Sequence, residues 1–318
     1  MEALIAAFLL DRGWVETTPQ VRFLAAGEYN QNYLILDGDT RLVFRINHGS
    51  QLGLADQIEY EFKALQCVAP SGATPRPLRV HGDARPFGGG VMLMEYLPGG
   101  PLVYERDWER AAEIFARIHA LPPCPELLVQ ADPVAAIASE SLALIERYPE
   151  HALPRQRGML LGYHERITRL GEDSRALFAA DRLCVVNTEV NSNNFLISPE
   201  SAYLVDWEKA VVSSRHQDLG HFLAPTTTLW KTETIFSPQQ KRDFLKAYHR
   251  RLENPPALEE LLRLSRIMEQ VIILRGLSWC FMAHHEYTHA AKPLTDEGTR
   301  ERIELYMRDM ERIIPPAS

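Results

Sequence analysis

The chain contains few cysteines, and none of them has the spacing of a metal site. Its four cysteines, Cys67, Cys124, Cys184 and Cys280, are far apart and form no C-x-x-C pair. This spacing argues against a zinc site and against a disulfide framework. We therefore expect four reduced thiols in the core of a cytoplasmic protein.

The chain also lacks a dense run of basic residues and a long apolar segment. Its formal net charge is -8, from 42 acidic and 34 basic residues, which argues against a nucleic-acid surface. The apolar start carries Glu2, has no preceding basic region, and reaches Asp11 too soon for a membrane span. We expect an amphipathic first helix and neither a nucleic-acid nor a membrane partner. Nothing in the sequence indicates the oligomeric state.

Glycine-rich phosphate loops of the G-x-G-x-x-G type are missing as well. The triplet Gly88-Gly89-Gly90 precedes an apolar strand rather than a helix, so it is typical of a turn. The sequence has no internal repeat. With 318 residues, 46% of them hydrophobic, the chain is long enough to bury a sizeable core in one large domain or two lobes.

The order of apolar patterns divides the chain into two parts. Alternating or continuous apolar runs predict strands before residue 98, and helical spacing predicts one helix over 55–67. Beyond Pro98-Gly99-Gly100 the pattern becomes mostly helical, including a long tract over 258–289. We predict an α+β protein with a small β-rich lobe over 1–97 and a larger, mostly helical lobe over 98–318.

Two acids and an amide form the most informative constellation. Glu189 is followed five residues later by Asn194, and Asp206 ends a short apolar strand. Runs 195–197 and 203–205 flank a turn cluster, so a hairpin would bring Asn194 and Asp206 to the same end. In phosphoryl-transfer sites one carboxylate accepts the proton of the attacking hydroxyl, while an amide and a second carboxylate hold Mg²⁺. The alternative is a solvated loop beside an ordinary hairpin.

These residues resemble those of the aminoglycoside phosphotransferase and choline-kinase-like family. That family usually has His-Gly-Asp-x-x-x-x-Asn followed by an Ile-Asp-Trp strand and a further Asp-Leu. The resemblance implies a protein-kinase-like two-lobe fold, Glu189 as the catalytic base, Asn194 and Asp206 as Mg²⁺ ligands, and Asp218 as a brace of the catalytic loop. The chain departs from the pattern where Asn187 and Glu189 replace His and Asp. Glutamate keeps the carboxylate on a longer arm, and a displaced base lowers the rate.

The same resemblance assigns the nucleotide side of the site. Arg45, on a strand where kinase-like proteins usually have Lys, would contact the phosphates of ATP, and Glu61 on the next helix would aim it. Asn30 would take the place of glycines in the loop over the phosphates. The backbone of the hinge at Glu95 and Leu97 would meet adenine. The alternatives are an edge-strand charge for Arg45 and a solvated helix face for Glu61.

The acceptor is expected to bind in the helical lobe. Aromatic rings there can stack on a sugar or surround a quaternary ammonium group, although aromatic residues at helical spacing often belong to the core. The candidates are Trp230, Trp279, Phe281, His284, His285 and Tyr287.

One triplet copies the family motif in the wrong place. His81-Gly82-Asp83 has the expected letters, but Gly88 rather than Asn stands five residues after Asp83. We interpret it as a turn and assign it no catalysis.

The sequence therefore predicts an ATP- and Mg²⁺-dependent phosphotransferase acting on a hydroxyl group of a small-molecule metabolite. The altered Asn187-Thr188-Glu189 leaves open a pseudokinase that binds nucleotide or ligand but transfers little or no phosphate. An antibiotic-modifying kinase is a third possibility, because an acidic chain suits polycationic drugs. The identity of the acceptor and the preference for ATP or GTP do not follow from the sequence.

Overall fold

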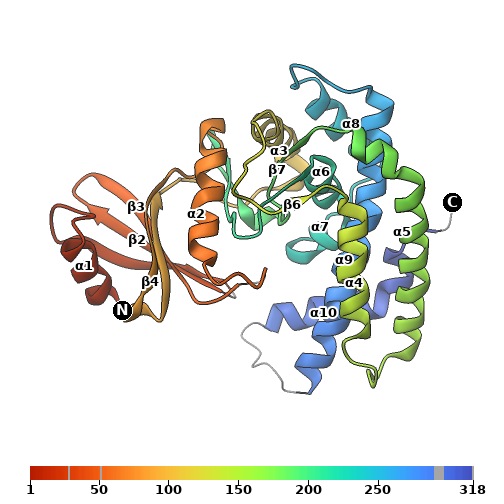
Figure 1. The fold of residues 1–318 in the computed structure, drawn as a ribbon, viewed down its shortest axis with the longest axis horizontal. Coiled ribbons are helices and arrows are strands. Elements are labelled where there is room, and N and C mark those ends of the chain that lie inside the picture. The colour runs from red at the N-terminus through yellow and green to blue at the C-terminus, as the bar shows by residue number, and fades with distance from the viewer. Residues whose placement is uncertain (28, 51, 290–296, 317–318) are drawn as a thin grey trace.

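The N-terminal region is built on a five-stranded antiparallel sheet of order β1-β2-β3-β5-β4 (Figure 1). The structure is a computed structural model and describes residues 1–27, 29–50, 52–289 and 297–316. The strands and helices of this region are α1 (Glu2–Asp11), β1 (Gln20–Ala26), β2 (Asn30–Asp37), β3 (Thr40–Asn47), α2 (Gln57–Val68), β4 (Pro77–Ala84) and β5 (Gly89–Glu95).

Helix α1 covers the outer side of the sheet. Its buried residues Ile5, Phe8 and Leu9 share a core with Phe44 of β3 and Phe87 of the β4–β5 connection. Gly38 supplies the positive φ of +58° in the tight turn between β2 and β3. The expected first helix is therefore present, and β2 and β3 form a hairpin.

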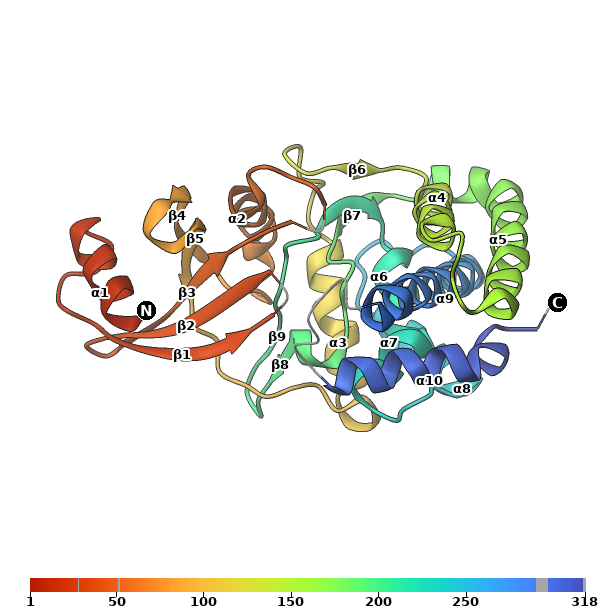
Figure 2. The same cartoon turned by 90° about the horizontal axis from the view of Figure 1, so that it is seen from below.

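The C-terminal part is predominantly helical and carries two small sheets (Figure 2). Its helices are α3 (Tyr104–His119), α4 (Pro133–Glu146), α5 (Pro154–Ala180), α6 (His216–Leu223), α7 (Pro225–Lys231), α8 (Pro238–His249), α9 (Leu258–Thr288) and α10 (Glu297–Ile313). Its strands are β6 (Val129–Gln130), β7 (Leu183–Val186), β8 (Phe195–Ile197), β9 (Ala202–Leu204) and β10 (Val211–Ser214). The helix expected over 258–289 is α9, and the hairpin expected near 195–205 is the β8–β9 pair.

Helix α2 lies between the sheet and the helical part (Figure 1). One continuous core joins Ile58 and Leu65 of α2 and Met92 of β5 to Phe115 of α3 and Phe222 of α6. The α+β, kinase-like arrangement expected from the sequence is confirmed by this architecture. A division at residue 97 remains a prediction.

Two side chains of α2 tie that helix to the segment after β9. Gln57 donates to the carbonyl of Glu208 at 2.7 Å, and the Tyr60 hydroxyl donates to the carbonyl of Ala210 at 2.6 Å. Since Glu61 lies on the same helix, these contacts set its position relative to Asp206.

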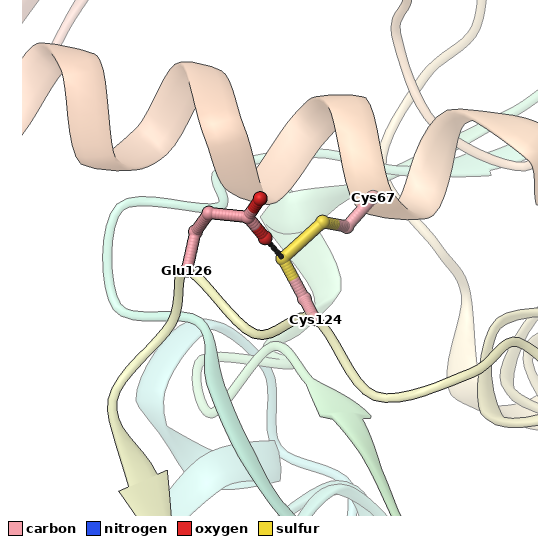
Figure 3. A group of neighbouring side chains, drawn as sticks. All are labelled: Cys67, Cys124 and Glu126. Carbon is pink, nitrogen blue, oxygen red and sulfur yellow. Dashed lines mark hydrogen bonds between the residues drawn. A yellow bond between two sulfur atoms is a disulfide. The ribbon is translucent and has the colours of Figure 1, made fainter.

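The cysteine expectation was wrong for one pair. Cys67, near the end of α2, and Cys124, in the loop after α3, form a disulfide, with Glu126 beside it (Figure 3). Packing of α2 against the helical part brings together two cysteines 57 residues apart, which sequence spacing does not reveal. Cys184 and Cys280 are buried free thiols, as expected. Within the described residues, no helix has both the length and the apolar character needed to cross a membrane.

Candidate active site

The loop that follows β7 is held in shape by a buried carboxylate. Asp218 of α6 is fully buried and accepts hydrogen bonds from the backbone amides of Asn187 at 2.9 Å and Thr188 at 2.8 Å. His119 of α3 lies 3.2 Å from the same carboxylate. Thr188 adopts a left-handed φ of +69°, which is unfavourable for a β-branched residue. The surrounding hydrogen bonds therefore maintain a strained loop, a common feature of functional sites.

Asn187 connects this loop to the segment after β9. Its buried side chain accepts from the amide of Glu189 at 3.0 Å and donates to the carbonyl of Asp206 at 2.8 Å. The amide side chain thus fixes the distance between the expected base and the expected metal ligand. Asn187 stands where the family usually has His, and its side chain still positions the backbone of Glu189 relative to Asp206.

Glu189 is held from two sides. Its carboxylate pairs with Lys209 at 2.5 Å, and its backbone carbonyl accepts from the side chain of Asn194 at 2.6 Å. Both ionic partners are partly buried, with side-chain exposures of 27% for Glu189 and 12% for Lys209. The sequence reasoning did not assign a role to Lys209.

Asn194 and Asp206 flank the same end of the β8–β9 hairpin. The amide of Val205 donates to the carbonyl of Asn194 at 2.8 Å, so the ends of β8 and β9 are joined directly. Asp206 has a left-handed φ of +65°, which turns the chain at the end of the hairpin. Asp tolerates this region better than most residues.

Three carboxylates, including that of Asp206, lie close together. Carboxylate oxygens of Glu189, Asp206 and Glu208 all lie within 4.8 Å of one another. Burial, followed by repulsion from Asp206, raises the pKa of Glu208 to about 8. Oxygen donors in such a cluster suit a hard divalent cation such as Mg²⁺. The residues present therefore fit the metal that the sequence predicted.

Glu208 was missed by the sequence reasoning. It follows Asp206 by two positions, but β9 ends at Leu204 and Asp206 has a left-handed φ, so strand alternation does not predict where the side chain of Glu208 points. A hydrogen bond of 2.5 Å from Asn30 reaches Glu208, and no local pattern predicts that contact.

Arg45 lies at the centre of the interface between sheet and hairpin. It is buried, pairs with Glu61, and donates to Asp206 at 3.0 Å and to Asn32 at 3.0 Å. Burial opposes its charge, but the carboxylates of Glu61 and Asp206 outweigh burial and keep the pKa of Arg45 above its usual value. Burial likewise raises the pKa of Glu61, against the effect of Arg45. The alternative of an exposed edge-strand charge does not hold for Arg45, nor a solvated face for Glu61.

The other expected nucleotide contacts lie at the two ends of the sheet. Asn30 at the start of β2 is buried, and its side chain also accepts from Asn47 at 2.9 Å. The amide of Glu95 donates to the carbonyl of Arg76 at 2.9 Å, at the end of β5. Leu97 is buried just beyond β5.

Comparison with known proteins decides the family. The profile of the phosphotransferase enzyme family matches residues 20–261, most of the chain. The chain belongs to this family. A search of curated proteins found no match.

Solved structures share the fold of this phosphotransferase family member. A choline/ethanolamine kinase family protein from Mesorhizobium loti is 20% identical with a TM-score of 0.63, covering 99% of this chain and 94% of its own. Choline kinase LicA from Streptococcus pneumoniae is 18% identical with a TM-score of 0.62 and 98% coverage of both chains. A spectinomycin phosphotransferase, solved with ADP and spectinomycin, is 13% identical with a TM-score of 0.58, covering 98% of this chain and 94% of its own. At these identities the likeness establishes the fold.

A cavity of about 540 Å³ begins at Glu189 and extends into the helical part. Trp230 of α7 and Trp279 of α9 line it, as the sequence suggested. The other aromatic candidates lie outside the described lining: Phe281, His284, His285 and Tyr287. Phe281 instead stacks on His151, with ring centroids 3.8 Å apart, so it belongs to the core.

Proposed function

We propose that this protein is an ATP- and Mg²⁺-dependent phosphotransferase that acts on a hydroxyl group of a small metabolite in the cytoplasm. The observation that supports this most strongly is the cluster of Glu189, Asp206 and Glu208, of which Glu189 also lines the cavity. Phosphoryl transfer depends mainly on positioning and on charge stabilisation. A carboxylate cluster beside a buried arginine and an open acceptor cavity provides both.

Asn194 and Asp206 are the residues we expect to hold Mg²⁺, with Glu208 close by. When bound, the ion would offset the negative charge of the phosphates of ATP. Arg45 would contact the α and β phosphates, and Glu61 would keep its guanidinium in place.

On the acceptor side, Glu189 is placed to receive the proton. As the hydroxyl oxygen bonds to the γ-phosphorus, its proton passes to the carboxylate, and the bond from phosphorus to the bridging oxygen of ATP breaks. The products are a phosphate monoester and ADP. Lys209 keeps the carboxylate of Glu189 oriented through their ion pair, and Asn187 holds its backbone at the correct distance from Asp206.

On the nucleotide side, Asn30 would contact the phosphates from the loop that lies over them. The backbone at Glu95 and Leu97 would meet the adenine ring. These assignments require Asn30 to exchange its contact with Glu208 for one with nucleotide.

A thermal-shift titration with ATP and with Mg²⁺·ATP tests the proposal. A ligand at about 100 times its Kd adds roughly 2.7 kcal/mol of stability, so wild type should show a metal-dependent rise in Tm. Asp206→Ala should lose that rise. The matched control is Asp83→Ala in the misplaced His81-Gly82-Asp83 triplet, where the side chain is 80% exposed. Equal metal-dependent shifts in wild type and Asp206→Ala would show that Asp206 is not a metal ligand.

A pseudokinase is the alternative, and two contacts favour it. Lys209 already neutralises Glu189, and Arg45 already occupies one oxygen of Asp206. Glu189→Asp separates the two functions. In an active enzyme adapted to Glu, the shorter arm would lose Lys209 and turnover would fall. In a degraded site, the shorter arm would restore the usual family residue and turnover would rise.

A further inference from the structure

The cavity beyond Glu189 carries information about the acceptor itself. Its volume of about 540 Å³ lies in the range of small-molecule sites. Its walls come from α4, α7 and α9, and it reaches Tyr306 of α10. Any molecule phosphorylated next to Glu189 would have to extend into this space.

The charges of the cavity wall are balanced. Each described glutamate in the lining has a basic partner that is also in the lining. The pairs are Glu189–Lys209 at 2.5 Å, Glu286–Arg147 at 3.4 Å and Glu140–Arg275 at 3.7 Å.

His221, also in the lining, adds no charge at neutral pH. Burial, helped by repulsion from Arg275 and Lys209, lowers the pKa of His221 to about 3. A cationic acceptor would therefore meet three basic side chains and no uncompensated carboxylate in the described wall. Burying a charge without an unpaired group of opposite sign is unfavourable.

One wall of the cavity is aromatic. Trp230 and Trp279 lie nearly perpendicular, with ring centroids 5.7 Å apart and an interplanar angle of 81°. Both rings are partly exposed. The electron-rich face of an indole attracts the weakly positive C–H face of a saturated ring as well as cations. The balanced charges favour the uncharged ligand.

One of the same two helices, α7, also offers hydroxyl groups next to the tryptophans. Thr226 and Thr227 of α7 line the cavity, and within the described structure their buried hydroxyls have no hydrogen-bond partner. Buried polar atoms usually have a partner in native proteins. Gly276 allows α9 to pack closely against α7 at this wall, because a Cβ at position 276 would lie only 2.8 Å from the Cβ of Thr226.

We infer that the acceptor is a neutral, polyhydroxylated ring such as a sugar or cyclitol. Its C–H face would pack on Trp230 and Trp279, and its hydroxyls would bond to Thr226 and Thr227. A further hydroxyl would face Glu189. The inference rests on the proposed phosphotransferase function for the reaction, but its binding prediction is separate from catalysis.

Binding to the full-length protein with Mg²⁺·ADP present tests the inference. Saturation-transfer NMR titrations would compare glucose, ribose and myo-inositol with choline and spectinomycin. We expect at least one of the three neutral compounds to bind about tenfold more tightly than choline and spectinomycin, a difference of ~1.4 kcal/mol.

Two variants link binding to the wall. Trp279→Leu should weaken the neutral ligand about tenfold through the lost ring contact, whereas Trp108→Leu on α3, outside the cavity lining, should not. Arg275→Gln should free Glu140 and strengthen choline binding without equal gain for the neutral ligand. An unchanged nucleotide-induced shift in Tm would show that each variant is folded.

The outcomes separate this inference from the proposed function. If choline or spectinomycin binds more tightly than all three neutral compounds, or if none of these three binds while Mg²⁺·ADP stabilises the protein, the acceptor class is wrong and the phosphotransferase proposal stands. If a neutral ring binds but neither Mg²⁺·ADP nor Mg²⁺·ATP stabilises the protein, the acceptor class is supported and the phosphotransferase proposal fails.

Discussion

Thr188 gives the sharpest test of the loop geometry, because its backbone and its side chain have opposite effects on stability. Its φ of +69° is unfavourable for any residue with a Cβ, by roughly 1–2 kcal/mol. Its hydroxyl donates to the carbonyl of Lys209 at 3.1 Å, and the residue is 97% buried, since 3% of its surface is exposed.

The magnitudes follow from these contacts. Thr188→Ala loses the hydrogen bond, about 1 kcal/mol, and a buried methyl group, about 0.8 kcal/mol, while keeping the backbone strain. Thr188→Gly loses the same groups and also the buried β-carbon, about 0.8 kcal/mol, and it gains flexibility in the unfolded state, about 0.4–1 kcal/mol, but it relieves the strain. We therefore expect the glycine variant to be at least as stable as the alanine variant, by up to about 1 kcal/mol.

Urea unfolding followed by tryptophan fluorescence measures this difference as a shift in midpoint. Ser192 in the same loop is the control, because its φ is not in the left-handed region. At position 192 the free energy of unfolding of the alanine variant should exceed that of the glycine variant by about 0.5–1 kcal/mol. If the alanine variant is more stable than the glycine variant at both position 188 and position 192, the left-handed loop and the bracing role assigned to Asp218 are wrong.

Three further predictions concern charge, cross-linking and acid stability. Arg45→Met should destabilise the protein by about 3–5 kcal/mol in chemical unfolding, because it leaves the carboxylate of Glu61, 1% exposed, without its main partner; an equal effect of Arg45→Lys would contradict this. Cys67→Ser should lower stability by about 4 kcal/mol in oxidising buffer, since the disulfide closes a loop of 57 residues, and should match wild type in reductant. Burial lowers the pKa of His216 to about 3 from 6.5, so unfolding takes up a proton and stability falls as pH drops from 6.5 towards 3. His216→Gln should reduce the loss of stability between pH 6.5 and 3, whereas His48→Gln, at an exposed position, should leave it unchanged.

Local signals were sufficient for much of the fold and for part of the site. The turn residues between 198 and 201 predicted the β8–β9 hairpin, and the hairpin alone brings Asn194 beside the segment that carries Asp206. The apolar run Leu42-Val43-Phe44 likewise predicted the strand that carries Arg45. In each case the information lies within about twenty residues, where chain geometry leaves few alternatives.

The contacts that sequence reasoning missed join distant segments. Lys209 meets Glu189 across the loop, and Asn30 reaches Glu208 across 178 positions. The Cys67–Cys124 disulfide depends on α2 packing against the helical part. Side-chain pairs of this kind follow from tertiary packing, so no periodicity or spacing rule could identify them.

The departures from the family motif form a consistent set in three dimensions. Glu189 extends further than Asp, and the longer arm meets Lys209. Asn187 replaces an imidazole with an amide that still bonds to both sides of the site.

Four carboxylates then face two basic side chains around the site: Glu61, Glu189, Asp206 and Glu208 with Arg45 and Lys209. With all four ionised, the excess of two negative charges equals the charge of one divalent cation. Without such an ion, the raised pKa of Glu208 allows a proton to relieve part of that repulsion. A site that had lost its function would have no reason to keep this excess, because replacing a buried carboxylate by an apolar residue is often stabilising. The charge pattern therefore favours an active phosphotransferase over a relic scaffold.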